Sequence, residues 1–208
     1  MLYGGRISLG VGLLAATVSC GIDLSMGALA GYAGGRLDGL LMRLVDLTLA
    51  LPTFFLLIVV QALLPLCLLT IALIIALTRW MALARLLVRG QFLSLKERDF
   101  VQAARTIGCS AWRIVFRHLL PNTSSQIAVF FTLALADAIL IKSALSFLGL
   151  GLPPSQPSWG SMLADGRASV LAGTWWVALF PGLMILLMTL TVNLLGDGIQ
   201  TALRAFSL

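Results

Sequence analysis

Charged side chains are scarce in this sequence of 208 residues: Asp, Glu, Lys and Arg make up 11% of it, whereas hydrophobic residues make up 60%. Soluble globular domains contain about 25% charged and about 45–50% apolar residues. A soluble fold of this length has too little interior for so much apolar surface, so we expect a lipid bilayer to cover much of it. The length permits one domain, covering residues 1–208.

Cysteine and histidine are also rare. Cys20, Cys67 and Cys109 lie far apart without a C-x-x-C pair, and His118 is the only histidine. This pattern indicates neither a disulfide framework nor a zinc site, so we expect no metal ligands and no catalytic residues. The phosphate-binding pattern G-x-x-x-x-G-K-[ST] is absent as well, so we expect any nucleotide to be bound by a partner.

The net charge of +6 arises from fourteen Lys and Arg against eight Asp and Glu. Half of the basic residues lie in one stretch, namely Arg85, Arg89, Lys96, Arg98, Arg105, Arg113 and Arg117. Such clustering is typical of a cytoplasmic loop in a membrane protein. A nucleic-acid-binding face would combine basic with aromatic residues, but the aromatic residues here lie mainly in apolar runs, so we exclude nucleic acid as a partner.

Long apolar runs predict an all-α, polytopic bundle of membrane helices. A spanning helix needs about 20 mostly apolar residues, because each adds about 1.5 Å across a hydrocarbon core of roughly 30 Å. Five runs meet this requirement, at about residues 7–32, 44–64, 66–87, 125–147 and 175–195. They are continuously apolar rather than alternating, which favours helices over barrel strands.

The charge bias of the loops predicts the orientation. Ten Lys or Arg lie on one side, namely Arg36, Arg43, the seven clustered residues and Arg204, whereas the opposite loops contain only Arg167. The basic side is expected to be cytoplasmic, which places the 146–173 loop and the N-terminus outside. Because a chain that starts outside needs an upstream span to insert, we expect that a further helix precedes this sequence.

The cytoplasmic stretch is predicted to contain a short amphipathic helix. Ser94 and Glu97 have the spacing of a capping box at its start, and Gly108 is placed to end it. One face is expected to hold Phe100, Ala103, Ala104 and Ile107, and the other Arg98, Gln102 and Arg105. Such a helix is too short and too charged to span a membrane, so it lies on the membrane surface or docks on another protein.

This stretch resembles the signature of ABC importer permeases, which reads E-A-A, three residues, Gly, nine residues and then I-x-L-P. The present sequence has Gln102-Ala103-Ala104, three residues, Gly108, nine residues and then His118-Leu119-Leu120-Pro121. Gln102 replaces the signature glutamate and removes a charge. His118 replaces the usual isoleucine, as is familiar in the dipeptide, oligopeptide and nickel branch.

The resemblance to that branch covers nearly the whole chain and is strongest to its C-type permease subunit. The supporting fragments are GRISL (5–9), GYAGG (31–35) with MRLVD (42–46), ARLLVR (84–89), LSFLGLG (145–151), PSWG (157–160) and NLLGDG (193–198). The resemblance implies the MetI-like fold of type I importers. Members normally have six spans, the first of which would precede this sequence.

The resemblance also implies a mechanism and a set of partners. Two permease subunits form the pathway in the bacterial inner membrane, two cytoplasmic ATPase subunits bind ATP and Mg, and an extracytoplasmic protein delivers the substrate. The permease binds no cofactor itself. Within a coupling loop at about residues 94–121, the resemblance assigns ATPase contact to Gln102, Ala103, Ala104, Gly108 and Pro121.

Polar residues within the apolar runs are costly in hydrocarbon and usually face a cavity or a partner. We expect Asp46 and Asp137 to line the pathway or a subunit interface, whereas Asp23 and Lys142 are unexpected for the family. The Gly- and Pro-rich stretch 149–160 is expected to be a turn anchored by Trp159 at the membrane boundary. An alternative is that this stretch docks the substrate-binding protein.

Two other functions fit parts of the pattern. An ion-driven secondary transporter would use Asp23, Asp46 or Asp137, but it predicts an inverted repeat that the sequence does not show. A truncated, non-transporting pseudo-subunit would fit the missing first span and Gln102. Within the importer branch the substrate is a dipeptide, a longer peptide, glutathione or chelated nickel, and the lack of a His, Cys or Met cluster favours peptides.

Overall fold

A computed structural model describes residues 1–65, 67–83, 88–153 and 155–205. Every regular element within these residues is helical, as predicted. In chain order the elements are α1 (Leu2–Ala33), α2 (Gly35–Leu49), α3 (Thr53–Leu63), α4 (Leu68–Leu83), α5 (Arg89–Lys96), α6 (Asp99–Thr106), α7 (Ala111–Ile114), the π-helical turn η2 (Val115–Leu119), α8 (Leu120–Asn122), α9 (Ser124–Phe147), α10 (Trp159–Leu171) and α11 (Trp176–Ala205).

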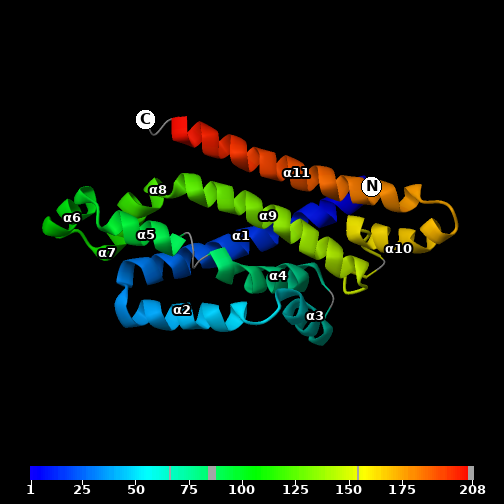
Figure 1. Cartoon of the computed structure of the whole chain (residues 1–208), viewed down its shortest axis with the longest axis horizontal. Helices are drawn as coiled ribbons and strands as arrows, with labels where there is room; N and C mark the ends of the chain where they lie inside the picture. The colour runs from blue at the N-terminus through cyan, green and yellow to red at the C-terminus, as the bar shows by residue number, and fades with distance from the viewer. Residues whose placement is uncertain (66, 84–87, 154, 206–208) are drawn as a thin grey trace.

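The centre of the bundle consists of α1, α9 and α11, with α9 packed between the other two (Figure 1). A stripe of small residues on α1 that includes Gly4, Ser8, Gly12 and Ala15 is buried at helical spacing. Small side chains let two helix backbones approach closely, which is the usual basis of helix association in membranes. At Gly12 a Cβ would lie only 2.8 Å from a side-chain carbon of Ile139, so glycine is needed for the observed contact with α9.

Three helices in the described part of the chain are long and apolar enough to cross a bilayer: Leu2–Ala33, Ser124–Phe147 and Trp176–Ala202. They confirm the first, fourth and fifth predicted spans. Within the described residues the helices provide three spans, or four if a bent pair counts as one, so the count of five stays a prediction.

The predicted second span is broken, so the expectation of one continuous helix over 44–64 was wrong. Helix α2 ends at Leu49 and α3 starts at Thr53, and the two axes differ by 84°. Pro52 lies in the break. Proline has no N–H for a helical hydrogen bond, and it disfavours the helical conformation of the residue before it, so a continuous apolar run does not give a continuous helix here.

The predicted third span corresponds to α4, whose described part runs from Leu68 to Leu83. Within the described residues its apolar part covers Leu68–Thr78, so the full length of this span stays a prediction. Residues 66 and 84–87 of that prediction lie outside the described residues. Helix α4 packs on α1 and α9, and Ile71 and Ile75 join Val11, Leu57 and Leu145 in one buried cluster.

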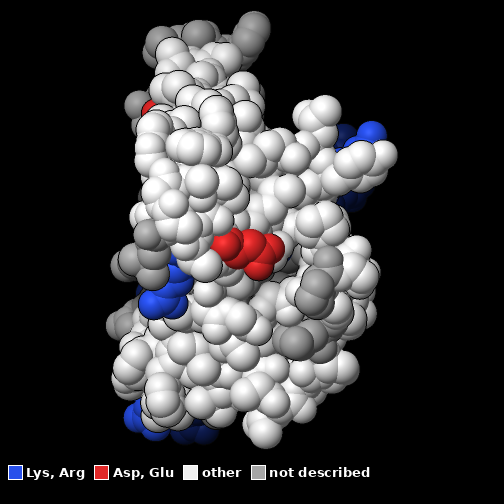
Figure 2. All heavy atoms as spheres, turned by 90° about the vertical axis from the view of Figure 1, so that its right-hand side faces the viewer, with Lys and Arg blue, Asp and Glu red and all other residues white. Residues whose placement is uncertain are grey.

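The two ends of the bundle differ in a way that agrees with the predicted orientation. The N-terminus and α10 lie at one end, whereas α5 to α7, the α1–α2 turn and the last turns of α11 lie at the other (Figure 1). Figure 2 views the α10 end, which is mostly uncharged, with one acidic patch near its centre and basic atoms toward its edges.

Helix α10 was not predicted, because the sequence of the 146–173 segment has no long apolar run. It begins with a capping box in which the side chains of Ser158 and Ser161 each bond to the other residue's backbone N–H. Trp159, the first residue of α10, is only 6% exposed, and its Nε1 donates to the carbonyl of Met1 at 3.2 Å. Its indole therefore packs against α1, and its position at the membrane boundary stays a prediction.

Candidate functional site

The predicted coupling loop forms a compact group of short helices at the end opposite α10. We call this group, which consists of α5, α6, α7 and η2, the loop group. Helix α5 ends at Lys96, Arg98 is extended, and α6 starts at Asp99. Ser94 therefore lies inside α5, and the predicted capping box with Glu97 was wrong. Phe92 and Leu95 of α5 are buried, and their packing extends this helix beyond Ser94, where the sequence pattern predicted the start of a new helix.

The end of α6 at Gly108 is confirmed. Gly108 has a φ of 79°, its N–H donates to the Arg105 carbonyl at 2.9 Å, and the Cys109 N–H donates to the Ala104 carbonyl at 3.0 Å. This pair of bonds is a Schellman motif, which satisfies carbonyls that the last helical turn leaves free. Glycine suits this position because a Cβ disfavours the left-handed conformation.

The two faces of α6 differ from those predicted. Val101 and Ala104 are buried against α5 and η2, whereas Phe100, Ala103 and Ile107 are exposed. Packing on Phe92 and Leu95 turns Val101 inward, a tertiary contact that the helical period alone does not reveal. Because of this rotation, Gln102 and Ala103 lie on the outer surface of α6.

The outer surface of this group is unusually apolar. Ile107 is 81% exposed and Trp112 is 73% exposed, and the Trp112 ring stacks on Phe116 with centroids 5.2 Å apart. We call this region the loop surface and define it as Phe100, Gln102, Ala103, Ile107, Trp112 and Phe116. Exposed apolar patches on this scale mark sites of interaction with other molecules. Trp112 and Phe116 were not singled out from the sequence, although their i, i+4 spacing is visible there.

Pro121 lies close to the start of the next long helix, as predicted. Residues 115–119 form the π-helical turn η2, α8 covers Leu120–Asn122, and the helix breaks at Thr123 before α9 begins at Ser124. Proline cannot donate a backbone hydrogen bond. The Asn122 side chain donates to the His118 carbonyl at 2.6 Å, so a side chain supplies part of the local bonding around the break.

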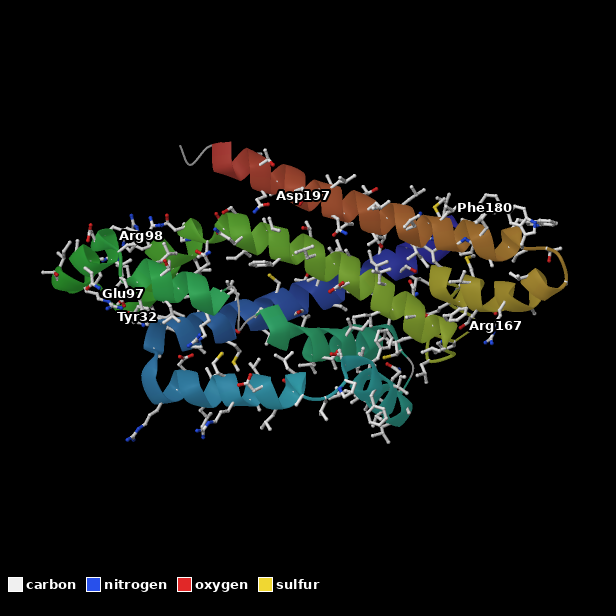
Figure 3. All side chains as sticks on the ribbon, viewed as in Figure 1. Tyr32, Glu97, Arg98, Arg167, Phe180 and Asp197 are labelled. Carbon is white, nitrogen blue, oxygen red and sulfur yellow. The ribbon has the colours of Figure 1, made fainter. Side chains whose placement is uncertain are left out.

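Contacts with the α1–α2 turn hold the loop group in place. Arg89 of α5 donates through Nε and Nη2 to the two carboxylate oxygens of Asp38 of α2, at 2.5 and 2.6 Å. This hydrogen bonding raises the pKa of the Arg89 guanidinium above its ordinary value. The Arg105 guanidinium lies 5.5 Å from the ring centroid of Tyr32, the penultimate residue of α1. Figure 3 shows Tyr32 at the same end of the molecule as Glu97 and Arg98.

The two acidic residues expected at the pathway or at an interface lie on different helices. Asp46 is exposed on α2. Asp137 is half-buried on α9 and lines a small cavity with Ser19 of α1 and Ile75 of α4. Asp23 is buried on α1 beside a second small cavity. Among the described residues no three His, Cys, Asp or Glu side chains lie together in a group suited to a metal ion.

Comparisons with known proteins agree with this arrangement. The profile of the family described as "Binding-protein-dependent transport system inner membrane component" matches residues 24–205. The chain is 42% identical over 201 residues to the dipeptide transport system permease protein DppC of Bacillus subtilis. This alignment covers 97% of the present chain and 62% of that relative. It is 40% identical to the glutathione transport system permease protein GsiD of Pectobacterium atrosepticum and covers 67% of that protein. It is 37% identical to the oligopeptide transport system permease protein OppC of Bacillus subtilis and covers 65% of that protein.

The chain thus spans about two thirds of the length of one of these relatives and slightly less than two thirds of the other two. Its fold is also similar to a chain of the MetNI methionine ABC transporter in an inward-facing conformation, with a TM-score of 0.80 over 97% of this chain and 95% of that one. The sequence identity of that match is 16%, so it establishes the shared fold.

Proposed function

Because the chain belongs to the family of binding-protein-dependent transport system inner membrane components, we propose that it is a permease subunit of an ATP-driven importer. In this role residues 1–208 act as one permease domain, form half of a translocation pathway and carry out no ATP hydrolysis. The protein is a multi-pass component of the bacterial inner membrane. A second permease completes the pathway in this proposal, and the pathway residues include Asp46 and Asp137.

The loop surface is the observation that carries this proposal. It lies on short helices that are capped and packed, at the end of the bundle that the charge bias places in the cytoplasm. An exposed apolar surface on a rigid support fits docking to another protein better than catalysis, which needs convergent polar groups. We therefore propose that it docks on one of two cytoplasmic ATPase subunits, which hold the ATP and Mg.

The residues of the signature contribute to docking in different ways. Gln102 and Ala103 are exposed and are proposed to contact the ATPase directly. Ala104 faces inward and Gly108 ends α6, so in this proposal both set the shape of the surface. Pro121 is exposed just before α9 and is proposed to fix how the loop group joins that span.

We propose peptides as the substrate class, delivered by an extracytoplasmic binding protein. The names of the similar permeases support this choice, since they refer to dipeptide, oligopeptide and glutathione transport. Helix α10 and the segment before it lie at the end where such a protein would dock.

Co-purification tests the assembly directly. The chain, expressed with its neighbouring permease and ATPase genes, should be retained with both ATPase subunits, and addition of binding protein with its peptide should stimulate ATP hydrolysis. A chain that retains no ATPase would contradict the proposal and would favour a pseudo-subunit or an amphipathic loop that lies on the membrane.

A further inference from the structure

The turn between α1 and α2 has an unusual backbone. Gly34 and Gly35 are consecutive and have φ values of 63° and 59°. Two successive residues in the left-handed region are rare for residues with a Cβ, so glycine permits this reversal at low cost. The reversal places the first turn of α2 beside α5, which follows about fifty residues later in the chain.

Asp38 and Arg89 join these two helices. The guanidinium presents Nε and Nη2 side by side, and the carboxylate accepts with both oxygens at 2.5 and 2.6 Å. Such a two-bond arrangement fixes orientation as well as distance, which a single bond to a lysine does not. Both side chains are partly shielded from solvent, with 15% and 29% of their surfaces exposed, so salt screens the pair less than it screens a fully exposed one.

Two further contacts hold the loop group against the end of α1. Phe92 of α5 is fully buried, and its Cβ lies so close to Gly31 that a Cβ on Gly31 would be only 2.6 Å away. Arg105 of α6 lies over the ring of Tyr32. The loop group is therefore connected to α1 through α5 and α6, and to α2 through the Asp38–Arg89 pair of α5.

We propose that Asp38 and Arg89 are positioning residues that transmit movement of α6 to the α1–α2 turn. This inference rests on the proposed docking of the loop surface on an ATPase. Neither residue belongs to the loop surface, so in this proposal the pair is not needed for docking and contributes to the movement that follows it. With the pair intact, displacement of α5 and α6 carries α2 with it. Without the pair, the loop group moves on its own, and ATP is hydrolysed with less substrate moved.

Four variants of the assembled importer, reconstituted in proteoliposomes, test this proposal. Asp38→Arg and Arg89→Asp each place like charges against one another, whereas the double exchange D38R/R89D restores opposite charges. Arg89→Lys keeps the charge but loses the two-bond geometry. Arg36→Gln is the matched control, because Arg36 is exposed two residues before Asp38 and has no part in the pair. The quantities measured are peptide taken up, ATP hydrolysed and ATPase retained on the purified permeases.

We expect the single reversals to lower peptide uptake per ATP at least fivefold while ATPase retention stays within twofold of the original protein. The double exchange should recover most of that ratio, R89K should give an intermediate value and R36Q no change. Unchanged uptake per ATP in both single reversals, or a double exchange no better than the singles, would overturn the proposal. If the unmodified complex retains no ATPase or moves no peptide with ATP, the proposed function fails instead, which is a separate outcome.

Discussion

Lys142 Nζ donates to Ser8 Oγ at 3.2 Å, deep between α9 and α1, where Lys142 is 0% exposed. The same Ser8 oxygen accepts from the backbone N–H of Trp159 at 3.3 Å. One hydroxyl therefore joins three helices, α1, α9 and α10, near the N-terminal end of the bundle. Lys142 was unexpected from the sequence, and its burial shows that it does not reach an aqueous surface within this chain.

This arrangement predicts that substitutions of its two side chains differ in their effect on stability. Ser8→Ala leaves both the Lys142 amine and the Trp159 N–H without their acceptor, and we expect it to lower the free energy of unfolding by about 1–3 kcal/mol. Lys142→Met keeps a side chain of similar length but removes a buried amine, and we expect no loss of stability, since burial of such a group is costly. Thermal unfolding of the purified protein in detergent measures both. A K142M protein less stable than S8A would contradict this account of the contact.

The packing of α10 on α9 predicts that Gly160 tolerates no side chain. A Cβ there would lie 2.6 Å from the carbonyl oxygen of Ser143 and 2.8 Å from its Cα, both backbone atoms. Gly160→Ala is expected to cost about 1–3 kcal/mol of stability, as overpacking does elsewhere. Gly39→Ala in α2 is the control: among the described residues nothing lies within 4 Å of the added Cβ, so helix propensity should make it neutral or stabilising by up to about 1 kcal/mol. Equal effects of the two substitutions on the unfolding midpoint would refute the prediction.

The end of α6 predicts a local effect at Gly108. Gly108→Ala forces a residue with a Cβ into a φ of 79°, at a cost of about 1–2 kcal/mol. We expect faster amide hydrogen exchange in the last turn of α6 and in Cys109, whose N–H closes the Schellman motif. Gly90→Ala, at an exposed helical position of α5 where no atom of the described residues lies within 4 Å of a Cβ, is the matched control and should leave exchange in α6 unchanged. Exchange rates that do not differ between the two variants would show that the motif does not hold the helix end.

Some features of this protein follow from sequence because they depend on local chemistry, and others do not because they depend on packing. The three long spans and the helix end at Gly108 are set by apolar runs and by glycine's conformational freedom, so both were predicted. The prediction of a single helix for the second span failed because it gave the hydrophobic run more weight than Pro52.

The errors in the candidate site arose from contacts made after the helices form. Packing against Phe92 and Leu95 decides where α6 starts and turns Val101 inward. The local sequence pattern around Ser94 does not reveal this packing. The Asp38–Arg89 pair joins residues 51 positions apart, so neither spacing nor motif pointed to it.

The loop surface predicts a docking variant that leaves the fold intact. Ile107 is exposed and belongs to neither buried cluster found in the described part of the chain, so Ile107→Asp should not change the unfolding midpoint. It does place a charge in the proposed interface, and we expect ATPase retention to fall about tenfold, which corresponds to about 1.4 kcal/mol. Ile107→Met keeps an apolar contact and should retain the ATPase. Normal retention by I107D would place the docking surface elsewhere on the protein.

The most direct test of whether this chain is an importer permease is to measure which energy source drives substrate uptake. The assembled complex, in proteoliposomes with its binding protein, should accumulate a labelled dipeptide only when ATP is present on the cytoplasmic side, and an uncoupler should not reduce that uptake. Uptake that continues without ATP and collapses when the uncoupler is added would contradict the importer account and would favour an ion-driven transporter.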